Sequence, residues 1–444
     1  MKNIISLLIL LVLISSCCSK TVSTPNIVII MADDLGYGGV SCYGNTTINT
    51  PNIDALAADG VRFTDFHSNG PACSPTRAAL MTGKYQQRTG VGGVITAKGH
   101  RDVGLSLSEI TIADEFKKYG YNSAMFGKWH LGYSKDYNPT YQGFDEFTGF
   151  VSGNIDYHAH IDLVGYLDWW QGTEIKNEEG YSTDLISDYA VDYIQNNNPN
   201  KTGKPFFLYI PHEAPHAPFQ RRVDKAVRKV GAPRDIRGVI QDSIPAIYKE
   251  MVEVMDEGIG NVVKTLKETG QYDNTVIVFL SDNGAMRFGH NGILRGFKGG
   301  AYEGGSRVPA IITYPAKIKK GIENDELVLT MDLLPTLLDL IGQKPSAEII
   351  DGISIKENLM YQTQLPERDV FFAFKNMSFV RSGDWKLIRI KNKKGVKLEL
   401  YNLSDDIQEK NDLRIDYPEL ANNLLKKIEL WEVEVSKGVS VVSY

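Results

Sequence analysis

The stretch "PNIVIIMADD", from Pro25 to Asp34, decides the fold class of this chain. Its apolar residues run without interruption from Ile27 to Met31, which is typical of a strand buried on both faces of a sheet. Two aspartates, Asp33 and Asp34, end the run, and the loop "LGYGG" follows. A buried strand that ends in acidic side chains indicates a sheet with a site at the ends of its strands.

Further buried strands are predicted within the stretches 205–219, 274–284 and 307–315. Helices are predicted between and after them, over 244–270 and 331–342, and the first of these has apolar residues at helical spacing. This alternation predicts an α/β fold with a large, mostly parallel sheet flanked by helices. Polar clusters follow the strands, and ligands of such sheets bind outside the carboxyl ends of the strands.

The pattern changes beyond residue 350. The stretch from Arg368 to Leu403 predicts short antiparallel strands with turns, and "PELANNLLKKIELWEVEV" (418–435) predicts an amphipathic helix. We therefore expect a large domain over 25–350 and a smaller α+β subdomain over 351–444.

The chain has 444 residues, 48 basic against 54 acidic side chains, and a net charge of -6. Its length favours one large domain with a smaller one. The acidic balance argues against nucleic acid as a partner. It still permits an anionic small substrate, because a basic pocket can lie in an acidic protein.

The N-terminus predicts a signal peptide over 1–16, and "ISSC" at 14–17 resembles a bacterial lipobox. Cys17 would then be lipidated, residues 17–24 would form a spacer, and the lipid would be the protein's membrane contact. A plain secreted protein is the alternative. The expected location is the bacterial outer membrane or periplasm. In an exported protein, the spacing of Cys42 and Cys73 also allows a disulfide.

Four oxygen-bearing side chains follow two of the predicted strands: Asp33 and Asp34 after one, and Asp282 and Asn283 after the other. One such pair is commonly a helix cap or an Asx turn. Two pairs at strand ends predict a site for a hard cation, Ca²⁺ or Mg²⁺ and not zinc.

Basic side chains also lie in the predicted strand-end loops: Lys128 and His130 in "GKWHLG", His212 and His216 in "PHEAPHAP", and Lys298 in a glycine-rich loop. Taken singly, such residues are usually solvated. Gathered beside a cation, they would neutralise a tetrahedral oxyanion, so sulfate and phosphate esters both fit.

Cys73 opens "CSPTRAALMTG" at the expected start of a helix. Alone it has three interpretations: a buried apolar thiol, a nucleophile, or the precursor of a modified residue. No serine in a GxSxG elbow offers another nucleophile.

Taken together, these stretches resemble the type I, formylglycine-dependent sulfatases of the alkaline phosphatase superfamily. The motifs that carry the resemblance are "PNIVIIMADDLGYGG", "CSPTRAALMTG", "GKWHLG", "PHEAPHAP", "FLSDNG", "GFKGGAYEGGSRVP" and "ELYNLSDD". Thr76 departs from the serine that is commonest in the family but keeps the hydroxyl. The resemblance implies an alkaline-phosphatase-like sandwich with a mixed sheet and a C-terminal subdomain with a short antiparallel sheet.

The resemblance also implies that a maturation enzyme oxidises Cys73 to formylglycine, whose hydrated form attacks sulfur. Arg77 would orient this diol, and Lys128 and Lys298 would hold the sulfate. His216 or Lys298 would protonate the leaving alcohol, and His130 would be the base that releases sulfate. The metal implied is Ca²⁺ in preference to Mg²⁺, and its ligands would be Asp33, Asp34, residue 73, Asp282 and Asn283. The domain over 25–350 would then be the catalytic one.

The expected substrate is a sulfated polysaccharide or oligosaccharide, with His158, His160, His212 and Arg295 as candidate contacts. Trp169 and Trp170 either stack on sugars or belong to the core. Two other functions fit the same pattern: a phosphodiesterase or phosphonate monoester hydrolase, and a surface lipoprotein that binds sulfated glycans with Cys73 unmodified.

Overall fold

The computed structural model describes residues 24–232 and 241–439. The signal peptide predicted over 1–16, Cys17, and the spacer up to residue 23 lie outside the described residues.

The central strand of the large sheet is β1 (Asn26–Ala32), the first buried run of the sequence. It pairs in parallel with β8 (Phe206–Pro211) on one side and with β9 (Thr275–Ser281) on the other. The sheet has ten strands within the described residues, in the order β11-β2-β10-β9-β1-β8-β4-β5-β6-β7. Its other strands are β2 (Val61–Phe63), β4 (Asn122–Lys128), β5 (Glu146–Phe150), β6 (Trp170–Gln171), β7 (Glu174–Ile175), β10 (Ala310–Thr313) and β11 (Ile322–Asn324). The five strands from β9 to β5 are mutually parallel, which confirms the predicted mixed, mostly parallel sheet.

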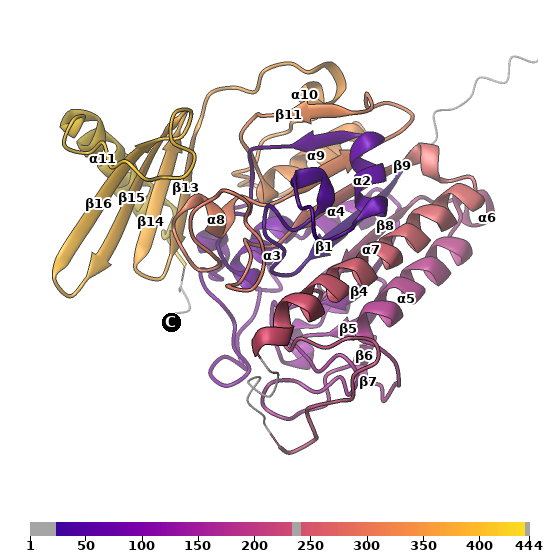
Figure 1. The fold of residues 1–444 in the computed structure, drawn as a ribbon. Helices are drawn as coiled ribbons and strands as arrows, with labels where there is room; N and C mark the ends of the chain where they lie inside the picture. Colours follow the sequence, from indigo (N-terminus) through magenta and orange to yellow (C-terminus); the bar gives the residue numbers. More distant parts are fainter. Residues whose placement is uncertain (1–23, 233–240, 440–444) are drawn as a thin grey trace, which may run out of the picture.

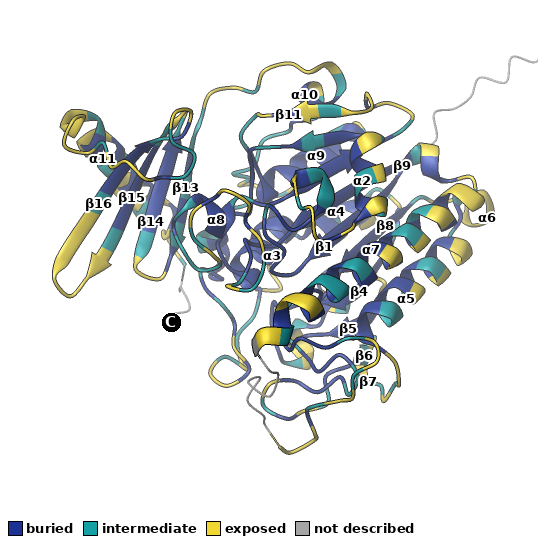
Figure 2. Ribbon diagram, viewed as in Figure 1, coloured by how far each residue is buried: buried dark blue, intermediate teal, exposed yellow. Residues whose placement is uncertain are grey.

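Helices cover both faces of this sheet (Figure 1). Ile27, Ile29 and Met31 of β1 point to one face and Val28 and Ile30 to the other, as the strand period requires. The first face packs against α3 (Cys73–Thr82), α4 (Ile112–Lys118) and α9 (Leu333–Leu340). The second packs against α2 (Pro51–Ala58), α5 (Ser182–Asn196) and α7 (Ile244–Glu268). Figure 2 shows the buried strands and the exposed outer sides of α5 and α7.

Shorter elements complete the large domain. They are β3 (Phe66–His67) and β12 (Val328–Leu329), which pair in parallel, together with the helices α6 (Pro199–Thr202), α8 (Glu303–Ser306) and α10 (Lys356–Tyr361).

The C-terminal part forms a second sheet of four antiparallel strands, as predicted. Its strands are β13 (Asp369–Phe374), β14 (Met377–Ser382), β15 (Trp385–Asn392) and β16 (Gly395–Asn402), and α11 (Pro418–Val435) packs against them. Trp431 of α11 contacts Tyr85 of the large domain edge to face, with ring centroids 5.1 Å apart. The subdomain is therefore docked through a shared apolar cluster.

The disulfide that the spacing of Cys42 and Cys73 allowed is not formed, because both are free thiols. Cys73 is buried in the site described below, whereas Cys42 is half-buried and donates its backbone N–H to Asp54. In the described part of the chain, no helix is long and apolar enough to span a membrane.

Candidate active site

The two acidic stretches meet because the strands before them are parallel and adjacent. Ala32 at the end of β1 pairs with Ser281 at the end of β9. The next residues therefore leave the sheet side by side, and the backbone N–H of Asp34 donates to Oδ1 of Asp282 at 3.2 Å. Asp34 has a φ of 62°, a left-handed turn at the end of the strand.

Three carboxylates are thus buried together at this edge: Asp33, Asp34 and Asp282. Burial raises the pKa of Asp33 to about 7, helped by Asp282 and opposed by Lys128. Burial would also raise the pKa of Asp34, but Lys298 and His216 hold it at about 2.

The donor atoms fit a hard cation. Oδ2 of Asp34 and Oδ1 of Asn283 are buried without a hydrogen bond among the described residues. Single ligand atoms of Asp33, Asp34, Cys73 and His216 lie within 4.8 Å of one another. Clustered buried carboxylates with unsatisfied oxygens favour a bound Ca²⁺ or Mg²⁺.

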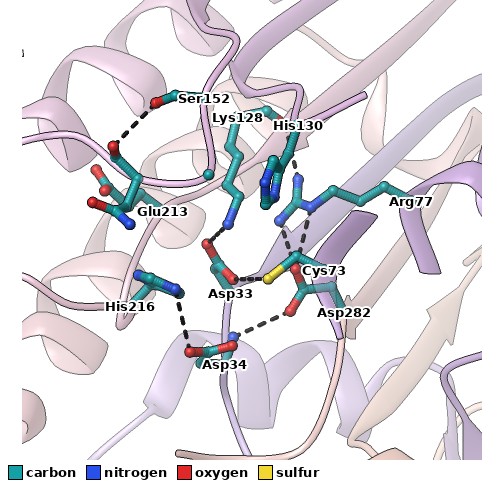
Figure 3. Close-up of polar contacts among 12 residues, drawn as sticks. Asp33, Asp34, Cys73, Arg77, Lys128, His130, Ser152, Glu213, His216 and Asp282 are labelled. Atoms are coloured by element: carbon teal, nitrogen blue, oxygen red, sulfur yellow. Dashed lines mark hydrogen bonds and ion pairs between the residues drawn. The ribbon is translucent and has the colours of Figure 1, made fainter. Parts of the chain in front are cut away.

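Cys73 is the first residue of α3, and its side chain faces the carboxylates (Figure 3). Its Sγ lies 3.6 Å from Oδ1 of Asp33 and 3.2 Å from Nζ of Lys298. Burial raises the pKa of the thiol to about 12, in spite of Lys128 and Lys298. The unmodified side chain is therefore a protonated thiol at neutral pH and a poor nucleophile.

Thr76 shapes the turn that leads to Cys73. Its Oγ1 donates to the carbonyl of Gly70 at 2.8 Å and accepts from the Gly70 N–H at 3.2 Å. A serine hydroxyl can make the same two bonds, so the departure at this position preserves the local structure.

Three cationic side chains surround Cys73. Arg77, one helical turn later, donates to Oδ2 of Asp282 at 2.8 Å and to the carbonyl of Lys128 at 2.8 Å. Nζ of Lys128 forms a buried ion pair with Asp33. Nζ of Lys298 lies 2.5 Å from Oδ1 of Asp34. Burial alone would lower the pKa of Lys298, but the Asp34 carboxylate raises it well above its usual value.

Two histidines complete the site, and both are neutral. Burial lowers the pKa of His130 well below its usual value, and Lys128 adds to the effect. Nε2 of His130 bonds with the carbonyl of Ile95 at 2.8 Å, and its Nδ1 has no partner in the described chain. Burial lowers the pKa of His216 to about 3, and its Nε2 lies 3.5 Å from Oδ2 of Asp34.

These groups open into a pocket of about 170 Å³. Cys73, His130, His216 and Lys298 line it, together with Tyr133 and Leu163. The residues predicted for catalysis are therefore brought to one place, with Arg77 and Lys128 buried behind the pocket.

The residues predicted to contact substrate are placed differently. His160 is buried, bonds with the Gly180 carbonyl at 3.1 Å and stacks on the buried Trp169, which makes both of them core residues. His158 bonds with the carbonyl of Arg221 at 2.9 Å. Neither histidine is among the described residues that line the pocket.

His212 and Arg295 also have structural surroundings. His212 is buried, and burial lowers its pKa to about 3. Arg295 lies over the ring of Tyr302, 3.8 Å from its centroid, and donates to Tyr401 Oη at 3.3 Å. Arg295 therefore ties the glycine-rich loop to the C-terminal subdomain.

Sequence reasoning missed Glu213 and Tyr133. Glu213 is buried, accepts from the Ile155 N–H at 2.7 Å, and has its pKa raised well above the usual value by burial. Tyr133 lines the pocket, and only its position three residues after His130 linked it to the site in the sequence. For Glu213 the sequence signal was its position inside the motif "PHEAPHAP", between two histidines predicted for the site.

Comparisons with known proteins agree with this geometry. A family model described as sulfatase matches residues 25–343, and one described as N-sulphoglucosamine sulphohydrolase, C-terminal, matches residues 297–434. N-acetylgalactosamine-6-sulfatase of Mus musculus is 32% identical over 375 residues, covering 78% of this chain and 68% of its own length. Arylsulfatase A of Homo sapiens is 32% identical over 402 residues, covering 82% of this chain and 74% of its own length.

A solved structure is similar along nearly the whole chain. Ps i-CgsB in complex with k-i-k-neocarrahexaose superposes with a TM-score of 0.83 at 29% identity, covering 95% of both chains. The sulfatase family model, which matches residues 25–343, covers most of the described chain and includes Asp33, Asp34, Asp282 and Asn283. Sulfatases hydrolyse sulfuric esters. The chain therefore belongs to the sulfatase family, within the alkaline phosphatase superfamily.

Proposed function

We propose that this protein hydrolyses sulfate esters of a sulfated polysaccharide or oligosaccharide, with formylglycine made from Cys73 as the nucleophile and Ca²⁺ as the metal. One observation carries the proposal: Cys73 opens α3 inside a pocket, in contact with both an acidic cluster and Lys298.

The surroundings of Cys73 favour a modified side chain. Its raised pKa leaves little thiolate, and a thiolate would form a thiosulfate with no second hydroxyl to expel sulfate. Hydrated formylglycine would supply one hydroxyl for attack on sulfur and a second whose deprotonation releases sulfate by C–O cleavage. The partner that this requires is a formylglycine-generating maturation enzyme.

The proposed calcium would be held by Asp33, Asp34, Asp282 and Asn283, with residue 73 completing the set. Bound there, it would polarise a sulfate oxygen and favour the ionised diol. The amide of Asn283 donates Nδ2 to Asp34 Oδ1 at 2.7 Å, and a rotation of that amide would present its oxygen instead.

The cationic residues are held ready for an anion. Hydrogen bonds to Asp282 and to the Lys128 carbonyl hold Arg77 in one conformation. Its guanidinium would therefore orient residue 73 with little further loss of conformational entropy. Lys128 and Lys298 place two ammonium groups near Cys73, where they would balance the charge of a bound sulfate.

Proton transfer is assigned by the states of the side chains. His130 is neutral with an open Nδ1, so it fits the base that takes the proton of the second hydroxyl. Lys298 is protonated, and His216 is neutral in the unliganded protein. This difference favours Lys298 as the donor to the leaving alcohol, with His216 orienting the ester oxygen.

The glycan substrate is proposed from the neighbour that binds neocarrahexaose and from the small pocket. A pocket of this size holds the sulfate and leaves the sugar at its mouth. We also propose export and lipid anchoring at Cys17, as the N-terminal pattern predicts, with the bacterial outer membrane or periplasm as the location.

Mass analysis of the tryptic peptide from Phe63 to Arg77, from protein matured in its native host, tests the nucleophile. We expect a peptide lighter than the thiol form, with an aldehyde that reacts with a hydrazide probe. A retained thiol in active protein would contradict the proposal, and in inactive native protein it would support a glycan-binding role.

Turnover of 4-nitrophenyl sulfate against that of the phosphate mono- and diesters tests the reaction class. We expect the sulfate ester to be preferred. A preference for the phosphodiester would identify the protein as a phosphodiesterase instead.

A further inference from the structure

We propose that Arg101, whose guanidinium lies over Tyr133 of the pocket wall, binds a second anionic group of the substrate next to the sulfate ester that is cleaved. The inference rests on the proposed function and adds to it that the substrate carries more than one negative charge. Neither sequence motifs nor the expected contacts pointed to this residue.

The guanidinium of Arg101 is held in place by two aromatic rings. Its Cζ lies 4.6 Å from the ring centroid of Tyr166 and 5.6 Å from that of Tyr133. The side chain is still 44% exposed. In the described part of the chain, none of its N–H groups donates a hydrogen bond.

A buried carboxylate forms an ion pair with this cation but no hydrogen bond. Oδ2 of Asp162 is 3.6 Å from Arg101 Nη1, beyond hydrogen-bond distance. Oδ1 of Asp162 accepts from the backbone N–H groups of Val164 and Tyr166, at 3.0 and 2.8 Å. Asp162 therefore shapes the loop that carries Tyr166 and leaves the guanidinium fork open to the solvent.

Arg101 is close to the reacting groups through Tyr133. Tyr133 lines the pocket, and its ring lies edge-on to that of His130, with centroids 6.4 Å apart. Leu163, which precedes Tyr166 in the same loop, also lines the pocket. A saccharide whose sulfate enters the pocket would therefore pass Arg101 with the same or the adjoining sugar unit.

The chemistry of the fork specifies the ligand. A planar guanidinium with open N–H groups binds tetrahedral sulfate or planar carboxylate through two parallel hydrogen bonds. Stacking on two rings reduces the entropy lost on binding, because the side chain is already oriented. The second group is therefore a sulfate ester or a uronate carboxylate.

Kinetics of the calcium-loaded, matured enzyme test this assignment. The probes are 4-nitrophenyl sulfate, which has a single charge, and a panel of monosulfated, disulfated and uronate-containing sulfated mono- and disaccharides. For Arg101→Gln we expect kcat/KM on doubly charged probes to fall roughly tenfold to hundredfold, mainly through KM, because a charge-assisted hydrogen-bonded pair is lost. Turnover of 4-nitrophenyl sulfate should change less than twofold. Whichever doubly charged probe shows the fall identifies sulfate or carboxylate as the ligand.

Arg62→Gln is the matched control, since Arg62 also lies over a tyrosine, 5.1 Å from the Tyr43 centroid, and pairs with an exposed carboxylate on another strand. It should change neither activity. An equal fall on all probes with Arg101→Gln would assign a structural role and overturn the inference. So would wild-type enzyme that turns over singly charged saccharides as well as doubly charged ones. Wild-type enzyme that hydrolyses no sulfate ester at all would instead refute the proposed function.

Discussion

Two buried clusters in this molecule contain the same kinds of side chain and differ in how their charges are satisfied. The active-site cluster comprises Asp33, Asp34, Asp282, Asn283 and His216, and the interdomain cluster comprises Asp65, His67, Glu303, Glu409, Arg307, Arg381 and Lys386. Each offers at least three possible ligand atoms close enough for a metal ion.

In the interdomain cluster, cations already occupy the positions that a metal would take. Lys386 of β15 lies 2.8 Å from both Glu303 and Glu409, and Arg307 lies 3.2 Å from Asp65. The pKa of Asp65 lies well below its usual value because Arg381 and Arg307 outweigh the effect of burial. Cations likewise hold the pKa of Glu303 below its usual value, whereas burial raises that of Glu409. Asp65 and Glu303 are therefore stable as anions, and their ion pairs fasten the C-terminal subdomain to the large domain.

In the active-site cluster, each carboxylate also has a cationic partner, but some of the possible ligand oxygens remain unsatisfied. The pKa of Asp33 is raised to about 7, and Asp34 keeps an oxygen without a hydrogen bond among the described residues. Both clusters keep some buried polar atoms without a hydrogen bond, Glu409 Oε1 and Arg381 Nη1 in the interdomain cluster among them. What separates the two is that the active-site cluster meets a pocket. A cluster enclosed between domains stabilises the fold, and one that meets a pocket can bind a ligand.

The largest effect is expected for Cys73→Ser, which removes the residue that is modified. Turnover of sulfate esters should fall roughly 10⁴-fold or more, as when a catalytic nucleophile is removed, while the melting temperature stays near that of wild type. Steady-state kinetics and thermal unfolding measure the two. Cys42→Ser, at the half-buried thiol outside the cluster, is the control and should keep full activity. Wild-type turnover by the serine variant would exclude the proposed nucleophile.

The second effect is on stability and belongs to the interdomain cluster. Glu303→Gln leaves Lys386 and Arg381 with one carboxylate fewer, so we expect a loss of about 3–5 kcal/mol in the free energy of unfolding. Urea unfolding measures it, and Glu323→Gln, in an exposed ion pair, should cost less than about 1 kcal/mol. A loss of that smaller size at Glu303 would show that the network does not dock the subdomain.

The contrast between the clusters also marks what the sequence could predict. The apolar runs of β1 and β9 predicted two buried strands of a mostly parallel sheet that end in acidic residues. The structure adds that these strands are neighbours, which brings Asp33, Asp34, Asp282 and Asn283 together. The positions of such residues can be predicted, because the period of a strand and the common direction of parallel strands determine at which edge of the sheet the residues after each strand lie.

The remaining contacts depend on how loops pack, which no local pattern encodes. Glu303 meets Lys386 across 83 positions of sequence, and Arg101 is held by a tyrosine 65 positions later, Tyr166. His160 looked like a substrate contact because it is polar and lies in a loop, yet that loop folds inward and stacks it on Trp169. Burial of loop side chains is a tertiary property.

The third effect comes from removing the metal. Calcium at 100 times its dissociation constant should stabilise the protein by about 2.7 kcal/mol, and a chelator should reverse this together with activity. Asp34→Asn should abolish the calcium-dependent rise in melting temperature. Asp65→Asn should lower the overall stability and keep that rise. If Asp65→Asn removed it instead, the interdomain cluster would be the metal site.

The smallest effect compares the pH dependence of two buried histidines, measured on chelated protein: His212, outside both clusters, and His67 of the interdomain cluster. Burial lowers the pKa of His212 to about 3, from 6.5 in the unfolded chain. The stability that depends on its neutral form is complete above pH 6.5 and is lost as the pH falls toward 3, because the unfolded state then binds the extra proton. Burial also lowers the pKa of His67 in the interdomain cluster, but Glu303 and Asp65 oppose that shift.

His212→Asn should therefore flatten the fall of unfolding free energy between pH 6.5 and 5 by up to about 1.4 kcal/mol per pH unit, and His67→Asn by less. Urea unfolding at each pH gives the slopes, and His290→Asn, at an exposed position, is the control. Asp33 has a raised pKa, so its titration makes the free energy of unfolding rise as the pH falls, in wild type and in every variant. Only differences between variants are therefore compared. A larger change for His67 than for His212 would mean that Glu303 and Asp65 do not favour the protonated form of His67, which would contradict the ion pairing described for the interdomain cluster.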